Sequence, residues 1–235
     1  MKNIGRLSVI AILAVGVFSQ AHADILNPGE RPHPRPRFHS RPPVVSMDSE
    51  SVKITIAENK VRVEGAFVMV NNGGSAGVEM GYPVGQFEDA LNDFHVSVDK
   101  EAVGNITDEQ PGTTAGKLGP FPERRKRWNV PLDAGQSRTI RVTYWVKPWL
   151  RPAKGNDAKG GLLFFSYTLS SGSTWAANIR KATITVDLDG VKPDRVVERS
   201  PAGYALTRQG KRTTWTMQDF KPTEDIVVAF RPSGR

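Results

Sequence analysis

The chain has 235 residues, among them 22 glycines, 17 prolines and no cysteine, and its formal net charge at pH 7 is +8. This length is sufficient for one large or two small hydrophobic cores. The absence of cysteine excludes a disulfide framework, thiol catalysis, cysteine-ligated zinc and iron–sulfur clusters, so burial alone must stabilise the fold.

The N-terminus has the pattern of a cleavable secretory signal peptide. Lys2 and Arg6 precede a short apolar stretch, Leu7 to Phe18, and Ala21 and Ala23 then stand where signal peptidase prefers small residues. An uncleaved membrane anchor is the alternative, but a spanning helix needs roughly 20 apolar residues. We therefore predict that residues 1–23 are removed after Ala23. The mature protein is expected to be periplasmic or secreted and to lack a transmembrane segment, with a formal charge of 8 − 2 = +6.

Residues 24–45 are dense in proline and arginine and show almost no apolar periodicity. Proline removes backbone donors and favours the extended polyproline II conformation. This composition predicts a disordered, exposed arm, followed by a globular part over residues 46–235.

A period of two dominates the globular part. Strands are predicted at about 51–57, 60–71, 78–82, 94–98, 128–132, 140–146, 162–169, 184–188, 215–217 and 226–230. Alternation of apolar and polar residues is typical of strands that bury one face. The stretch 162–169 is nearly continuous in apolar residues, which predicts a central strand covered on both faces.

Interruptions of the alternation give further expectations. Gly65 is expected to mark a β-bulge that changes which side chains face inward. The run from Asn71 to Gly74 (NNGG) is a strong turn signal. Phe87 to Asp93 is interpreted as a short helical turn.

These elements predict an all-β fold, a β-sandwich of the immunoglobulin-like or a related kind, preceded by the signal peptide and the arm. One elaborated sandwich is favoured. The alternative is two tandem smaller sandwiches that are joined near residues 148–161.

One segment resembles a known group of proteins. Gly172, Trp175 and Ile179 form a G-x-x-W-x-x-x-I element just before a predicted strand. This element is similar to one in exported bacterial β-sandwich proteins of unknown function. The resemblance implies the sandwich fold and an exported protein, and it implies no particular chemistry.

Tryptophans are the first class of candidate site residue. Trp145 and Trp149 flank a Lys-Pro pair at a strand end, and Trp175 follows a glycine turn. Exposed indoles on a sandwich stack well against sugar rings, so these three are candidate ligand-binding residues. The alternative is packing in the core or in an interface, which is the simpler interpretation for Trp128, Trp175 and Trp215.

Basic residues are the second class. Arg124, Arg125, Lys126 and Arg127 precede the strand at Trp128, and a hairpin or loop tip is predicted there. Together with the arginines of the arm they could contact a polyanion of the cell envelope. The alternative is solvated charge that keeps a loop tip soluble. No nucleic-acid partner is expected for an exported chain without a recognition fold.

The sequence contains no recognisable catalytic motif. There is no Gly-x-Ser-x-Gly elbow and no Ser-x-x-Lys motif with its partners. His33 and His39 lie in the arm, and His95 is predicted to face solvent on its strand. A copper site of the kind found in lytic polysaccharide monooxygenases would need His22 as the mature N-terminus and His95 nearby, which the predicted cleavage site disfavours.

The sequence therefore predicts an exported, non-enzymatic protein that acts by binding or as an envelope accessory, with no catalytic residue, metal or cofactor. Its partner would be a cell-envelope polymer or another envelope protein. Three alternatives remain open: a carbohydrate- or cell-wall-binding module, a copper-dependent or hydrolytic enzyme, and a structural protein that pairs through a strand edge.

Overall fold

The computed structural model describes residues 45–84, 91–109, 124–151, 161–169, 177–202 and 204–233. Within these ranges every regular element is a strand, apart from the three-residue 3-10 helix η3 (Pro193–Arg195). The all-β class predicted from the alternation is confirmed. No helix in the described ranges has the length and apolar character needed to cross a bilayer.

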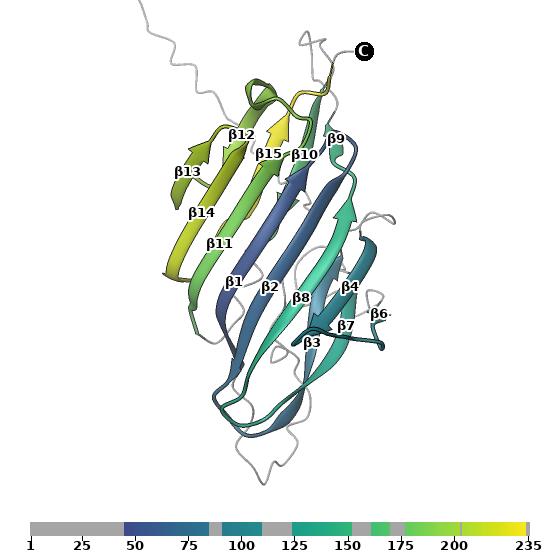
Figure 1. The fold of residues 1–235 in the computed structure, drawn as a ribbon, viewed down its shortest axis with the longest axis vertical. Coiled ribbons are helices and arrows are strands. Elements are labelled where there is room, and N and C mark those ends of the chain that lie inside the picture. The colour runs from purple at the N-terminus through teal and green to yellow at the C-terminus, as the bar shows by residue number, and fades with distance from the viewer. Residues whose placement is uncertain are drawn as a thin grey trace, which may run out of the picture.

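Three sheets make up the described fold (Figure 1). The eight-stranded sheet has the order β13-β14-β11-β1-β2-β8-β4-β5, and its strands are β1 (Val45–Ile56), β2 (Val61–Asn71), β4 (Asn92–Val98), β5 (Glu101–Ala102), β8 (Ser137–Val146), β11 (Ile179–Leu188), β13 (Ala205–Gln209) and β14 (Arg212–Phe220). The four-stranded sheet has the order β12-β15-β10-β9, with β9 (Trp149–Arg151), β10 (Leu162–Tyr167), β12 (Val196–Ser200) and β15 (Ile226–Phe230). The three-stranded sheet has the order β3-β7-β6, with β3 (Ala76–Val84), β6 (Thr107–Glu109) and β7 (Arg124–Leu132).

Both smaller sheets cover one face of the eight-stranded sheet, here called its inner face. Tyr167 of β10 donates a hydrogen bond to Glu50 of β1 at 2.7 Å. A hydrogen bond of 3.3 Å links the hydroxyl groups of Tyr82 in β3 and Tyr144 in β8. In Figure 1 the four-stranded sheet lies behind the upper part of the large sheet and the three-stranded sheet behind its lower right part. Inward side chains from all three sheets form one hydrophobic cluster. The fold is therefore a β-sandwich, wider than the four-against-three arrangement of an immunoglobulin domain.

β1 lies in the middle of the large sheet and joins early and late parts of the chain. It pairs with β2 in antiparallel orientation and with β11 in parallel orientation. The strand order places strands from both sides of residues 148–161 in this one sheet. Its register shifts between Met47 and Ser49, so Asp48 is an extra residue and the inward positions change from odd to even numbers.

The predicted bulge at Gly65 is wrong, because β2 keeps its alternation without a break. Gly65 pairs with Val52 and Val142 in regular register and faces inward, like Val63 and Phe67. A Cβ atom at Gly65 would lie 2.7 Å from the ring of Phe67. The glycine makes room for a buried aromatic ring and does not shift the strand.

Gly65→Ala is therefore expected to lower the free energy of unfolding by about 1–3 kcal/mol, the usual cost of overpacking a core. Urea unfolding followed by tryptophan fluorescence measures it. Gly77→Ala is the matched control, because a Cβ at this exposed strand glycine would meet nothing within 4 Å. Equal effects of the two substitutions would contradict the packing role of Gly65.

The predicted turn after Asn71 is present, and it carries the chain from the large sheet to the three-stranded sheet. Asn71 is fully buried, and its Nδ2 donates to the carbonyl groups of Gly74 at 2.8 Å and Leu132 at 3.0 Å. Its Oδ1 accepts a hydrogen bond from the Gly73 N–H at 2.9 Å. One asparagine thus ties the β2–β3 turn to the end of β7.

Two other expectations need correction. β10 is an inner strand of its sheet, but only one face is fully covered: Phe165 and Tyr167 are buried, whereas Phe164 is half-buried on the other face. The helical turn predicted from Phe87 to Asp93 is wrong at its end, because β4 begins at Asn92. Residues 85–90 lie outside the described ranges.

Trp128 and Trp215 are buried in the core, as predicted.

Candidate functional site

Trp145 stands on the outer face of the eight-stranded sheet, near the end of β8. Its sequence neighbours Tyr144 and Val146 are buried, so the alternation of β8 turns the indole outward, where it is half-buried. Arg62 of β2 and Asn92 of β4 are its partners in register on either side. The indole therefore lies over the sheet between two neighbouring strands, and not at a free edge.

Two contacts fix the orientation of this indole. Its Nε1 donates a hydrogen bond to Asp93 Oδ2 at 2.7 Å, and Lys60 Nζ lies 4.7 Å from its ring centroid. Asp93 has a φ of 50°, and the β4–β8 register shifts between Asn92 and His95. Asp is one of the few residues that accept this left-handed conformation readily. A ring held by a hydrogen bond and a cation loses less conformational entropy when it binds a ligand.

A depression of about 370 Å³ adjoins the indole and is called here the Trp145 depression. It is lined by Glu58, Asn59, Lys60, Trp145, Lys147 and Pro148. The first three come from the turn between β1 and β2, which is closed by a hydrogen bond from the Ala57 N–H to the Lys60 carbonyl at 2.8 Å. A volume of this size is at the lower end of the range for small-molecule sites, roughly 300–1,000 Å³.

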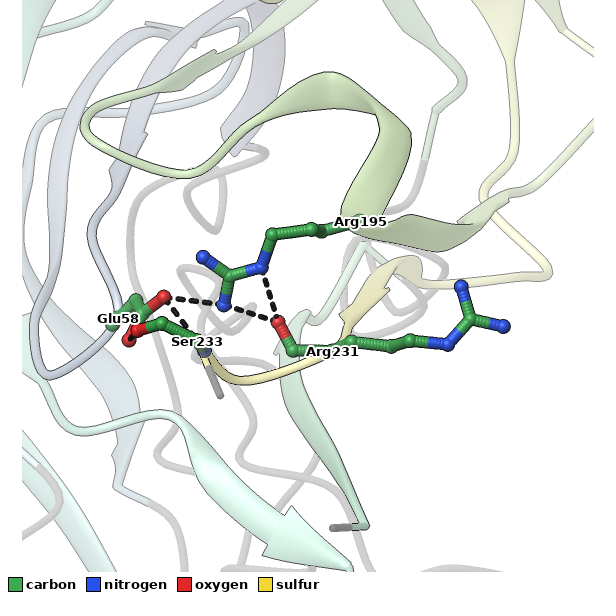
Figure 2. A network of polar contacts seen from close by, with 4 residues as sticks. All are labelled: Glu58, Arg195, Arg231 and Ser233. Atoms are coloured by element: carbon green, nitrogen blue, oxygen red, sulfur yellow. Dashed lines mark hydrogen bonds and ion pairs between the residues drawn. The ribbon is translucent and has the colours of Figure 1, made fainter. Parts of the chain in front are cut away.

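Figure 2 shows how Glu58 is tied to the C-terminal segment of the chain. Arg195 of η3 forms an ion pair with Glu58 and donates from Nε to the Arg231 carbonyl at 2.9 Å. The Ser233 N–H donates to Glu58 Oε1 at 3.0 Å, and the Ser233 hydroxyl donates to Oε2. The Ser233 hydroxyl, followed by Arg195, holds the pKa of Glu58 below its ordinary value. The ionised carboxylate of Glu58 thus lines the depression in a fixed position, and Arg195 already neutralises its charge.

The remaining charges at the Trp145 depression are positive. Lys60 and Lys147 line it, and neither forms an ion pair within the part of the chain that the structure describes. The Asp93 carboxylate, beside the depression, accepts the hydrogen bond from the indole N–H. The depression therefore offers an aromatic surface for apolar contact beside two lysines whose positive charge attracts anionic ligands.

The structure separates the tryptophans that the sequence grouped together. Trp149 is 43% exposed and lies on β9 of the four-stranded sheet, with its ring centroid 6.2 Å from that of Phe164. It does not line the Trp145 depression. Trp175 lies outside the described residues. Of the three predicted ligand-binding tryptophans, only Trp145 belongs to a described depression.

The basic residues predicted at a loop tip lie instead at the start of strand β7, which begins at Arg124. Lys126 pairs with Asp108 of β6 at 2.7 Å, and Arg127 pairs with Glu79 of β3. The side chains of Arg124 and Arg125 lie outside the described part of the structure. Acidic residues on the two flanking strands thus match the charges of Lys126 and Arg127, which weakens the case for a polyanion contact there.

His95 is exposed on β4, as predicted. His22, His33 and His39 lie outside the described residues. Across the described ranges, no three or more His, Asp or Glu side chains gather in an arrangement that could hold a metal ion.

Sequence reasoning missed Lys60, Asp93 and Glu50. Lys60 lies in a turn, and Asp93 lies at the irregular start of a strand. At such positions the alternation carries no information about contacts across the sheet. Glu50 is different, because it continues the inward alternation of Val52 and Ile54, and this was a readable signal. It is 2% exposed, accepts a hydrogen bond from Tyr167, and has no partner for Oε2 among the described residues.

Comparison with known proteins finds no matching family model and no matching curated protein. Among solved structures, the chain is similar to a Legionella pneumophila protein that is provisionally described as a nutrient binding protein. The TM-score is 0.65 at 14% identity, and the match covers 90% of this chain and 70% of the other.

Two enzymes match more weakly. An M1 zinc metallopeptidase from Deinococcus radiodurans has a TM-score of 0.38 at 10% identity over 81% of this chain and 43% of its own. Leukotriene A4 hydrolase from Saccharomyces cerevisiae has a TM-score of 0.43 at 12% identity over 85% of this chain and 32% of its own. This chain spans less than half the length of either enzyme. The similarity to the Legionella protein is one of fold.

Proposed function

We propose that this protein is an exported, non-enzymatic binding protein that takes an anionic saccharide of the cell envelope at the Trp145 depression. The observation that carries the proposal is the fixed indole of Trp145, placed beside Lys60 and Lys147, neither of which has an ion-pair partner among the described residues. Export follows from the predicted signal peptide, residues 1–23.

The chemistry of the depression suits recognition. The face of an indole packs against the C–H groups of a sugar ring, and its large apolar area adds affinity at little entropic cost. Lys60 and Lys147 supply charge for a carboxylate or phosphate on the sugar. The Asn59 amide lines the same depression and can hydrogen-bond to sugar hydroxyl groups.

Two further observations support a binding role. The Legionella protein with the same fold is described as a nutrient binding protein. The two carboxylates at or beside the depression are already engaged, Glu58 by Arg195 and Ser233 and Asp93 by Trp145. We therefore propose binding without a chemical step.

Trp145→Ala is expected to weaken the binding of uronic-acid oligosaccharides by about tenfold or more, because the stacking surface is lost. Isothermal titration calorimetry on the purified protein measures the dissociation constant. Trp149→Ala is the matched control, since Trp149 is a more exposed tryptophan outside the depression, and its affinity should stay within about twofold of the wild type.

The charge of the ligand is tested separately. Neutral oligosaccharides of equal length should bind more weakly than uronic-acid oligosaccharides, and added salt should reduce this difference. A loss of affinity in Trp149→Ala but not in Trp145→Ala would place the ligand on β9 and overturn the proposal, as would the absence of saccharide binding by the wild type.

A further inference from the structure

Two arginines face the interior of the sandwich at its lateral edge. β12 and β13 are the edge strands of the four-stranded and the eight-stranded sheet, and Figure 1 shows them together on one side of the molecule. β12 carries Arg199 and β13 carries Arg208. Both strands continue a sheet whose inner face is mainly apolar.

The strand registers give the direction of each side chain. Arg199 is opposite Val228 of β15, which is buried in the core, so Arg199 is on the inner face of the four-stranded sheet. Arg208 is opposite Thr213 of β14, which is also buried, so Arg208 is on the inner face of the large sheet. A register shift between Val196 and Glu198 sets this orientation of Arg199.

No carboxylate in the described part of the chain is paired with either arginine. Within the described ranges neither guanidinium takes part in an ion pair or a hydrogen bond. Glu198 is opposite Ala229, a position on the other face of the sheet, and accepts a hydrogen bond from Ser200 at 3.1 Å. Partial burial and the nearby charge of Arg208 lower the pKa of Arg199. Two like charges, a half-buried Arg199 and an exposed Arg208, thus lie near enough to repel each other.

From this geometry we propose that Arg199 and Arg208 form a binding site for a phosphate-class oxyanion, either a free phosphate group or a phosphodiester of an envelope polymer. A guanidinium donates two parallel N–H groups to such an oxyanion, and two arginines from different sheets can hold it from both sides. The anion would also remove the repulsion between the two cations.

This site is distinct from the Trp145 depression. Five strand intervals separate β13 from β8 in the large sheet, roughly 24 Å at the usual spacing between strands. Trp145 is on the outer face of that sheet, whereas Arg208 is on the inner face. Failure of one proposal therefore leaves the other standing.

The test measures the thermal unfolding midpoint of the purified full chain with increasing inorganic phosphate, at constant ionic strength set with chloride. A parallel series uses soluble poly(glycerol phosphate), to distinguish free phosphate from a polymer. Stabilisation in either series that saturates with concentration is the expected result, because a ligand that binds only the native state raises its stability.

Arg208→Gln is expected to weaken the phosphate effect by about tenfold or more, and Arg208→Lys should weaken it less because it keeps the charge but not the planar fork. Arg208 is exposed, so the fold should tolerate both changes. Arg141→Gln is the matched control, an exposed arginine on the outer face of β8. The proposal is overturned if neither anion stabilises the wild type, if Arg208→Gln responds like the wild type, or if Arg141→Gln loses the response equally.

Discussion

Glu50→Gln is expected to raise the free energy of unfolding by up to about 3 kcal/mol at pH 8 and to leave it almost unchanged near pH 4.5. Glu50 is buried between the large sheet and the four-stranded sheet. Glutamine has the shape of a protonated glutamate and cannot ionise, so it keeps the hydrogen bond from Tyr167 without the cost of a buried charge.

The direction follows from proton linkage. Burial raises the pKa of Glu50 from 4.5 to about 7, although the hydrogen bond from Tyr167 acts in the opposite sense. Below pH 4.5 the carboxyl group is protonated in both the folded and the unfolded chain. As pH rises towards 7 the unfolded chain releases the proton first, so the stability falls by at most about 1.4 kcal/mol per pH unit. Above pH 7 the loss is complete and constant.

Urea unfolding of the wild type and Glu50→Gln at pH 4.5, 6 and 8 measures this difference. Glu101→Gln, at an exposed position of β5, is the matched control and should change the stability by less than about 0.5 kcal/mol at each pH. Tyr167→Phe removes the hydrogen bond that favours the ionised form, so it should destabilise the protein more at pH 8 than at pH 4.5. A difference between wild type and Glu50→Gln that does not vary with pH would show that the carboxyl group does not titrate in this range.

Asn71→Ala is expected to lower the free energy of unfolding by about 3 kcal/mol. The substitution removes four side-chain hydrogen bonds, to the Gly74, Leu132 and Asp133 carbonyl groups and from the Gly73 N–H. The bond to Asp133 is the longest of them, at 3.3 Å, and a typical bond contributes about 1 kcal/mol. The backbone of Asn71 also accepts from the Gly135 N–H and donates to the Gln136 carbonyl. This residue therefore joins the β2–β3 turn to the β7–β8 connection, and both should loosen together.

The neighbouring Asn72→Ala is the control, because Asn72 is exposed and, among the described residues, its side chain hydrogen-bonds to Ser46 alone. Its effect should stay within about 0.5 kcal/mol. Amide hydrogen exchange measures the local consequence, with faster exchange expected in both connections for Asn71→Ala. Equal effects of the two substitutions on stability would show that Asn71 acts only through its turn conformation.

Several features of the candidate site could be predicted from residues alone. The alternation of β8 allowed Trp145 to face away from the core, and its place at a strand end marked it as a ligand-binding candidate. The same pattern did not distinguish Trp145 from Trp149, because two indoles that flank one Lys-Pro pair look alike in sequence. The separation came from pairing: Trp145 is in a strand of the large sheet and Trp149 is in the four-stranded sheet.

The basic residues show a different limit. Four consecutive cations suggested an exposed polyanion site, and Lys126 and Arg127 are indeed cationic residues on a strand. Their partners Asp108 and Glu79 come from the two neighbouring strands of the three-stranded sheet, at positions that no local pattern connects to β7. Conversely, no local pattern marked Arg199 or Arg208 as a candidate site residue. They became candidates because the registers of β12 and β13 place both side chains on the inner faces of their sheets.

Side-chain alternation along a strand is a local property with a period of two. For this reason the all-β class, most strand positions and the burial of residues such as Trp128 and Trp215 could be predicted from the residues alone. The tertiary fold, in contrast, sets which strands pair. It placed β11 beside β1 and brought Ser233 to Glu58, 175 positions away. Pairing over such distances depends on the closure of the whole core, and every contact that defines the Trp145 depression and the two-arginine site depends on that closure.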